Sequence, residues 1–239
     1  MRLLCFALVV VGCQTKTESA PTLDELPALT IEVATVAQPD ASTVLLIKTS
    51  YDWQTYLADH GGCAILSSDT AAMFDDTPVP LMSAGMDDEG ECLPPTFETE
   101  LALATSGAHH VTLPDAIAID FADGQVAARS ATPVSGEWTL IAGQSFTVTW
   151  STASDLAAQT PADIDAVFIP PSSNITVPLT GTAIGSDTIT MMVPAEPLGT
   201  GDGVLDLALG TVVGAATGCT GATQCTWSAT PGVWHAATL

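Results

Sequence analysis

Six carboxylates lie close together in the sequence and have the right chemistry for a cation: Asp75, Asp76, Asp87, Asp88, Glu89 and Glu91. Calcium takes about six to eight oxygen ligands, and carboxylates on a turn-rich loop can converge to supply them. The spacing does not match an EF-hand, which needs alternating acidic residues, a glycine and a distal glutamate. The segment therefore predicts either a calcium site or a solvated acidic loop.

Histidine and serine residues offer few other routes to catalysis. The pair His109-His110 has metal-binding chemistry, but neighbouring residues on a strand point to opposite faces of a sheet. Gly143-Gln144-Ser145 lacks the second glycine of a nucleophile elbow, and a strand pattern follows it where that elbow needs a helix. No catalytic serine is predicted. Paired carboxylates, as in glycosidases, stay open as an alternative in so acidic a chain.

The N-terminus has the pattern of an export signal. Met1-Arg2 is a short positive region, Leu3 to Val11 is unbroken apolar sequence, and Gly12 precedes Cys13. At about 1.5 Å per helical residue the apolar run spans about 14 Å, under half of a hydrocarbon core of about 30 Å. Residues 1–12 are therefore predicted to be a cleaved signal peptide and not a transmembrane helix.

The residues Val10-Val11-Gly12-Cys13 resemble the lipobox of bacterial lipoproteins, although Val10 stands where that family most often has Leu. The resemblance covers residues 1–13 only. It implies that the Cys13 thiol carries diacylglycerol and that acyl chains such as palmitate tether the protein to a membrane. Two or more acyl chains hold a protein stably in a bilayer. Gln14 after the cysteine implies the outer membrane. The alternative is an ordinary secretory signal that is cleaved elsewhere.

Once Cys5 and Cys13 are assigned to export and lipidation, four cysteines are left: Cys63, Cys92, Cys219 and Cys225. An even number in an exported protein predicts disulfides. Three pairings are possible, and we favour Cys63–Cys92 with Cys219–Cys225 because each pair lies inside one predicted domain. No nearby cysteine pair or well-spaced histidine completes a tetrahedral metal site around Cys219 and Cys225.

The charge of the chain restricts its partners. Asp and Glu number 27 against 4 Lys and Arg, which gives a formal net charge of −23. Nucleic acid and anionic lipid headgroups are poor partners because binding them requires Lys and Arg to neutralise phosphates. A cation, a cationic partner or simple solubility is compatible with this balance.

The elements that would hold these groups are mostly strands, because short alternating or β-branched apolar runs recur with turn residues every ~8–12 positions. One short helix is predicted where Trp53, Tyr56 and Leu57 precede Gly61-Gly62. Residues 74–95 are predicted to be one acidic, proline-rich loop, and Asp123-Gly124 to be a hairpin turn leading into a strand at 125–128. Further strands are expected at 29–36, 43–47, 97–104, 116–121, 138–141, 145–150, 165–169, 175–179, 188–193, 204–209, 211–216, 224–229 and 233–237.

These elements predict a mainly β protein with two antiparallel, sandwich-like domains behind a signal peptide. We expect a flexible tether over 13–27, an N-terminal β domain with the acidic loop over 28–123, and a C-terminal sandwich over 124–239. Ser145 to Trp150 resembles a strand of immunoglobulin-like bacterial surface domains. Cys219 and Cys225 depart from antibody domains, since they are too close in sequence to bridge two sheets. The five tryptophans are expected mostly in the core, with Trp227 and Trp234 the best candidates for ligand contact.

The leading functional hypothesis is therefore a lipid-anchored envelope protein that acts as a non-catalytic binding or assembly module for an envelope protein, a polysaccharide or a cation. The alternative is an envelope hydrolase that uses paired carboxylates or a bound cation. A spacer without a ligand is the third possibility.

Overall fold

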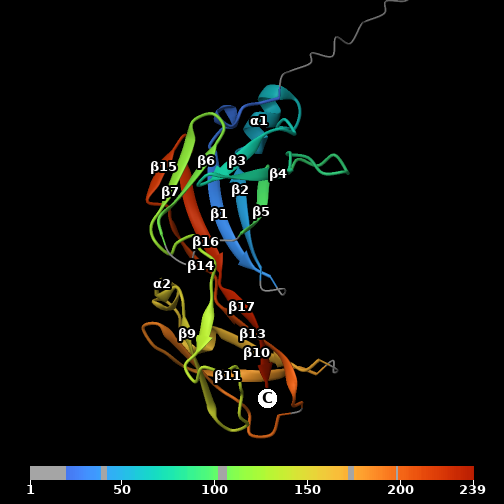
Figure 1. Ribbon diagram of the computed structural model, residues 1–239. Helices are drawn as coiled ribbons and strands as arrows, with labels where there is room; N and C mark the ends of the chain where they lie inside the picture. Colours follow the sequence, from blue (N-terminus) through green and yellow to red (C-terminus); the bar gives the residue numbers. More distant parts are fainter. Residues whose placement is uncertain (1–19, 39–41, 102–106, 172–174, 198) are drawn as a thin grey trace, which may run out of the picture.

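The computed structural model describes residues 20–38, 42–101, 107–171, 175–197 and 199–239 (Figure 1). Of the described residues, 49% lie in strands and 9% in helices, and the strands form two sheets. The prediction of a mainly β, sandwich-like protein is thus confirmed. The predicted signal peptide and Cys13 lie outside the described residues.

The first sheet has ten strands in the order β14-β16-β1-β2-β5-β4-β3-β6-β7-β15. All neighbours run antiparallel except β1 and β16, which pair in parallel with Val33 opposite Trp227. The strands are β1 Thr30–Ala37, β2 Thr43–Ser50, β3 Ala71–Phe74, β4 Thr77–Ser83, β5 Thr96–Leu101, β6 His109–Leu113, β7 Ile117–Phe121, β14 Val212–Ala215, β15 Gly218–Thr220 and β16 Gln224–Thr230.

The core of this first unit lies on one face of the sheet, as the alternation of apolar residues requires. Val33, Leu45, Ile47 and Phe97 are all fully buried there. The sheet curls around these side chains, so the opposite face of β1, β2 and β5 looks outward.

The second sheet has seven strands in the order β17-β13-β10-β11-β12-β9-β8, all antiparallel. Its core contains Trp150, Phe168, Ile189 and Met191. The predicted strand at 138–141 is irregular, although Leu140 N donates to Thr238 O at 2.7 Å. The strands are β8 Ala131–Pro133, β9 Ser145–Trp150, β10 Ile164–Ile169, β11 Val177–Ile184, β12 Thr188–Met192, β13 Asp202–Leu209 and β17 Gly232–Thr238.

The predicted short helix is confirmed as α1 (Trp53–His60), which ends at Gly61 in the left-handed conformation with φ 76°. Only Tyr56 of its apolar residues is buried, whereas Trp53 is 51% exposed. The other helical turns are α2 Ala153–Leu156, η1 Leu23–Glu25 and η2 Pro161–Asp163.

The division of the chain differs from the prediction of one domain over 28–123 and another over 124–239. Strands β14, β15 and β16 return to the first sheet, where β16 covers the edge that β1 would otherwise expose. The first unit therefore combines strands β1 to β7 with β14 to β16, and the second unit combines strands β8 to β13 with β17. Nothing in the sequence indicated that β14, β15 and β16 return to the first sheet, because the alternation of apolar residues predicts strands and not the strands with which they pair.

Two local predictions at the borders are also corrected. Part of the expected tether packs on the first unit, since Leu23 and Leu26 are buried and Leu23 N donates to Asp115 Oδ2 at 2.8 Å. The predicted strand at 125–128 is not a strand, because this segment leads to the second unit and buries Val126 and Ala127 on the way.

A buried ion pair lies where the two units meet. Arg129 donates to both oxygens of Asp155 at 2.9 Å, and Trp150 Nε1 donates to the same carboxylate at 3.1 Å. Arg129 also reaches Thr35 on β1 at 3.4 Å. One side chain thereby joins a strand of the first unit to α2 and β9 of the second.

Candidate functional site

The six predicted calcium ligands do not form one group. The segment 74–95, predicted to be a single loop, instead contains the β3–β4 hairpin, which carries Asp75 and Asp76 at its turn. The other four carboxylates lie on the following loop between β4 and β5. Among the residues that the structure describes, no three His, Cys, Asp or Glu side chains are grouped to hold a metal ion.

Asp75 is occupied by contacts with the neighbouring strand β6. One carboxylate oxygen accepts from His110 N at 2.9 Å, and the other lies 3.0 Å from His109 Nδ1. Asp75 also adopts a left-handed φ of 50° at the hairpin turn, which Asp tolerates better than most residues. Its role in the structure is to fasten the hairpin to β6.

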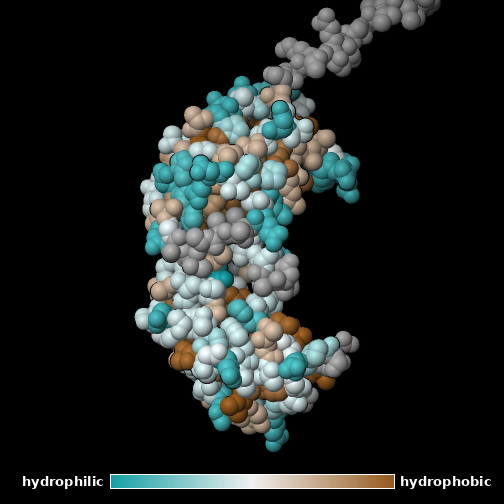
Figure 2. Space-filling view, in the orientation of Figure 1, coloured by the Kyte–Doolittle hydropathy of each residue, from teal (hydrophilic) through white to brown (hydrophobic). Residues whose placement is uncertain are grey.

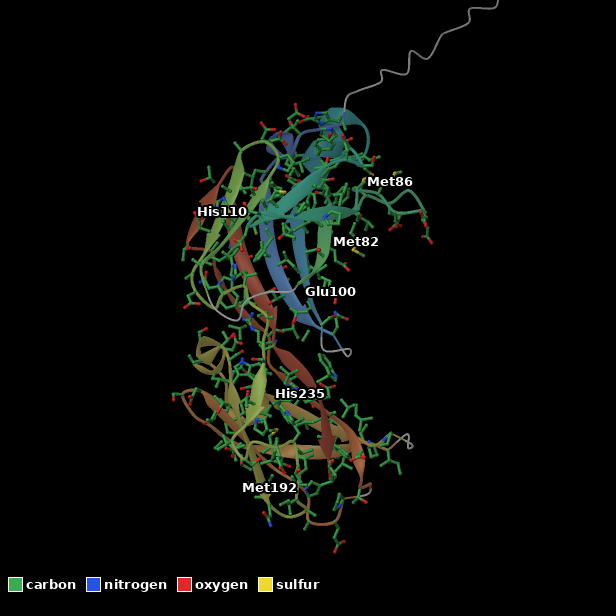
Figure 3. The ribbon with its side chains drawn as sticks, in the orientation of Figure 1. Met82, Met86, Glu100, His110, Met192 and His235 are labelled. Atoms are coloured by element: carbon green, nitrogen blue, oxygen red, sulfur yellow. A yellow bond between two sulfur atoms is a disulfide. The ribbon has the colours of Figure 1, made fainter. Side chains whose placement is uncertain are left out.

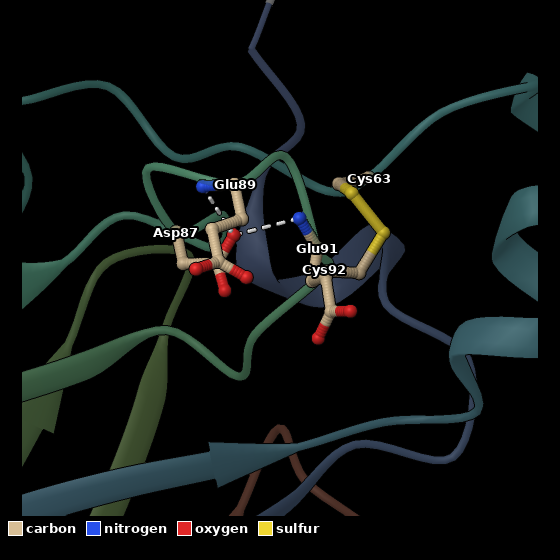
Figure 4. The surroundings of a disulfide bond; sticks show 5 residues. All are labelled: Cys63, Asp87, Glu89, Glu91 and Cys92. Atoms are coloured by element: carbon tan, nitrogen blue, oxygen red, sulfur yellow. Dashed lines mark hydrogen bonds between the residues drawn. A yellow bond between two sulfur atoms is a disulfide. The ribbon is translucent and has the colours of Figure 1, made fainter.

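Asp87 organises the second acidic loop. Its Oδ1 accepts from Glu89 N at 3.0 Å and from Glu91 N at 2.7 Å, as Figure 4 shows. The predicted disulfide Cys63–Cys92 closes this loop, with a Cα–Cα distance of 5.2 Å. The second predicted disulfide, Cys219–Cys225, is also present, with a Cα–Cα distance of 5.6 Å.

The histidine pair points to opposite faces of the first sheet, as predicted. His109 faces the core and is 8% exposed, and its buried Nε2 has no hydrogen-bond partner among the residues that the structure describes. His110 lies on the outer face, where its Nδ1 is 2.6 Å from Asp120 Oδ1. The two rings therefore cannot share one ligand.

A groove of about 560 Å³ lies on the outward face of β1, β2 and β5. Strand register places Val36 opposite Val44, and Leu46 opposite Glu98. Glu100 follows Glu98 on the same face of β5, opposite Val44. The groove thus has an apolar floor with two carboxylates along one side; it is lined by Val36, Gln38, Ser42, Val44, Leu46, Glu98 and Glu100.

The same outward face continues as a second hollow of about 420 Å³, whose lining includes Thr30, Ser50 and Gln224. Glu32 and Lys48 lie opposite each other at its base, with Lys48 Nζ 3.8 Å from Glu32 Oε2. Ser228 donates to the other oxygen of Glu32. The only cation on this face is therefore already beside a carboxylate in the part of the chain that the structure describes.

Ser42 also lines a smaller pocket of about 180 Å³ at the junction, together with Arg129 and Trp234. Trp234 is half-buried on the outward face of β17, and it donates a hydrogen bond to Asp206 across the strand pair. Burial raises the pKa of the Asp206 carboxyl, the Trp234 hydrogen bond lowers it, and the nearby charge of Asp165 raises it further. This pocket extends the groove towards the second unit.

Of the two tryptophans proposed for ligand contact, only Trp234 lines a pocket. Trp227 is 8% exposed, and Gly214 leaves the space that its ring fills, since a Cβ there would lie 2.6 Å from Trp227 Nε1. The expectation that most of the five tryptophans lie in the core holds only in part: Trp150 and Trp227 are buried, Trp138 packs partly buried against the second core, and Trp53 is 51% exposed.

The residues of the groove were not predicted from the sequence. The sequence predicted strands over 43–47 and 97–104, but it did not show that they pair or which side chains they turn outward. Val44 and Leu46 are in fact only half-buried on the outward face. The signal that could have predicted the groove was the presence of apolar residues on both faces of this strand in an otherwise acidic chain.

The concave side of the molecule gathers these features. Figure 2 shows a hollow between the hydrophilic loop that projects from the first unit and the apolar patches of the second. Met82, Met86 and Glu100 lie along this side in Figure 3, and Met82 is 67% exposed.

Comparison with known protein families found no matching family model, and no curated protein matches the chain. In the described residues, no helix has the length and apolar character needed to span a membrane.

Proposed function

We propose that this chain is a lipid-anchored protein of the cell envelope that acts as a non-catalytic binding or assembly module. Support for the anchor comes from the lipobox-like Val10 to Cys13 segment, and Gln14 favours the outer membrane. The two disulfides support an oxidising compartment. The likeness of the second unit to immunoglobulin-like surface domains stays a prediction.

The groove on β1, β2 and β5 is the observation that carries the proposed binding role. Side chains on the outward face of a sheet are usually polar, and apolar residues gathered in a hollow favour contact with another molecule. Val36, Val44 and Leu46 form such a floor on a surface that is otherwise rich in carboxylates.

The position of the N-terminus is compatible with this role. The described chain begins beside η1 at the end of the first unit, and the C-terminus lies at the far end of the second unit (Figure 1). A lipid on Cys13 would therefore hold the first unit nearer the membrane and leave the concave side accessible from the aqueous phase.

Membrane attachment is tested by Cys13→Ser in cells of the source species. We expect the unchanged protein in the membrane pellet, labelled by radioactive palmitate, and the variant in the soluble fraction without label. A variant that stays in the pellet would contradict the lipid anchor.

Binding is tested by placing a photoreactive amino acid at Leu46 in intact cells, with Val134 as the control. Val134 is 63% exposed on the second unit, away from the groove. We expect one or a few adducts of defined mass from position 46 and none from position 134. If illumination gives the same pattern from both positions, or none, the chain is better described as a spacer.

A hydrolase is the second candidate because Glu98 and Glu100 share one side of the groove. Glycosidases work with two carboxyl groups that flank the scissile bond. A screen of the purified protein against glycosides and esters, with Glu98→Gln and Glu100→Gln as controls, separates the two functions. Turnover that both variants abolish would replace the binding role with an enzymatic one.

A further inference from the structure

We infer that the occupant of the groove is a basic peptide segment that also carries apolar side chains, supplied by another protein. This inference rests on the proposed binding function and specifies the chemistry of the partner. It depends on three features of the groove: its floor, its charge and the pairing of its strands.

The floor requires an apolar contribution from the partner. Val36, Val44 and Leu46 lie on adjacent strands and form a continuous surface, because β1 and β2 pair directly. Met82 lies at a register shift between β4 and β5, and it is 67% exposed. Methionine adapts to different shapes, which suits a surface that binds side chains.

The carboxylates require a positive contribution. Within the described residues, Glu98 and Glu100 take part in no ion pair. Lys48 lies beside Glu32, and the Arg129 side chain is 3% exposed and bound to Asp155. With 27 Asp and Glu against 4 Lys and Arg, the chain has little means of neutralising this side of the groove from within. A partner with Lys or Arg would do so, and charge complementarity of this kind selects partners and speeds association.

The strand pairing shows how the partner is held. β2 lies between β1 and β5, so its backbone groups are already bonded on both sides. The partner therefore cannot bind here by adding a strand to the sheet edge. It must be held through side chains, as an amphipathic segment laid across a groove is held.

The test uses fluorescence anisotropy with the purified protein, in detergent if it is lipidated. The probe is a fluorescein-labelled helical peptide of about 14 residues, with Lys on one face and Leu at i, i+3 and i+4 positions on the other. Control peptides replace Lys by Glu, or Leu by Ser. The double variant Glu98→Gln with Glu100→Gln removes the groove charges while preserving side-chain shape. Asp88→Asn with Glu89→Gln makes the same charge change on the exposed acidic loop.

We expect the Lys/Leu peptide to bind. The groove double variant should raise its dissociation constant by about tenfold or more at physiological salt. The loop double variant should raise the dissociation constant by less than about twofold. Both control peptides should bind the unchanged protein more weakly than the Lys/Leu peptide does. Far-ultraviolet circular dichroism and the midpoint of thermal unfolding verify that both variants are folded.

The inference is overturned if the two double variants weaken binding equally, because the peptide then senses only the overall negative charge. It is also overturned if the Lys/Ser peptide binds as well as the Lys/Leu peptide, because the floor is then unused. If no peptide binds but the Leu46 adduct forms, the occupant is of another kind and the proposed function stands. If neither signal is seen, both fail.

Discussion

At the scale of single residues, Arg129 is the side chain on which the junction between the units depends most. The side chain is 3% exposed, donates twice to the fully buried Asp155 and reaches Thr35 on the first unit. A buried ion pair is costly to assemble, but removing one partner leaves an uncompensated charge inside the protein. The contribution of the ion pair to stability is therefore best measured by replacing Arg129 alone and then replacing both Arg129 and Asp155.

We expect Arg129→Met to lower the free energy of unfolding by ~3–5 kcal/mol, because the Asp155 carboxylate loses its counter-charge. Adding Asp155→Leu should restore part of that loss, although Trp150 then lacks its acceptor. Urea denaturation followed by tryptophan fluorescence gives both values. Asp155→Leu alone is measured in the same way, and a double variant that loses as much stability as the two single variants together would show that the residues are not coupled.

Asp206 gives a pH-dependent prediction. Burial, opposed by the Trp234 hydrogen bond and reinforced by Asp165, raises the pKa of its carboxyl in the folded protein above the usual 3.8. The folded state then holds the proton more tightly than the unfolded state, so this group makes stability fall as pH rises through the window above 3.8. At neutral pH the ionised carboxylate costs stability.

We therefore expect Asp206→Asn to raise the midpoint of thermal unfolding at pH 7 by about 1–2 °C, a small effect because Asp206 is partly exposed to screening solvent. Below the ordinary pKa of Asp the difference should vanish, since both side chains are then neutral. Glu89→Gln on the acidic loop controls for the loss of one negative charge. Equal shifts from the two variants would contradict a specific effect of burial at Asp206.

At the scale of elements, the two disulfides constrain loops of different length. Cys63 and Cys92 are separated by 29 positions, and Cys219 and Cys225 by 6. On the chain-entropy model, a cross-link stabilises more when it closes a longer loop in the unfolded chain.

We expect the pair Cys63→Ser and Cys92→Ser to lower the free energy of unfolding by about 3.5 kcal/mol, and Cys219→Ser with Cys225→Ser by about 2.4 kcal/mol. Urea unfolding of each variant under identical conditions tests the order. A larger loss for the short loop would show that native contacts around β15 and β16, and not loop entropy, dominate that cross-link.

Elements were predictable from the sequence to the extent that they depend on local pattern. The helix at Trp53–His60 and the strand Ser145–Trp150 are present because apolar spacing and a following glycine or turn specify them locally. The disulfides followed from cysteine parity and sequence distance.

Pairing between distant strands was not predictable in this way. The parallel pairing of β16 with β1 joins residues about 200 positions apart, and no local feature of Gln224–Thr230 distinguishes it from a strand of the second sheet. The groove was missed for the same reason, because its floor and its carboxylates come from separate strands whose register only the folded sheet defines.

At the scale of the whole molecule, the chain passes between the two units more than once. The connections follow β7, β13 and β16, and the last two are short. Together with the Arg129 contacts, they join the units at several points, so a freely hinged pair of domains is not the expected behaviour. We therefore expect the concave side that carries the groove, seen in Figure 2, to keep its shape in solution.

The response to calcium is a property of the whole acidic surface. A site with a dissociation constant near ~10⁻⁴ M would add ~2.7 kcal/mol at a hundredfold excess of the ion. For a chain of this size, that is a rise of about 5–10 °C in the midpoint of thermal unfolding. The structure separates Asp75 and Asp76 from the other four carboxylates and engages Asp75 and Asp87 with protein donors.

We therefore expect the midpoint in about 10 mM calcium to exceed that in EDTA by no more than about 2 °C, the effect of screening a negative surface. Magnesium and sodium chloride at matched ionic strength should give the same small shift, because screening depends on charge and concentration and not on coordination geometry. Differential scanning calorimetry measures all three. A rise above about 5 °C in calcium alone, abolished by Asp87→Asn, would show that the acidic loop rearranges to bind the ion. Cation-dependent binding would then have to be added to the role of the groove.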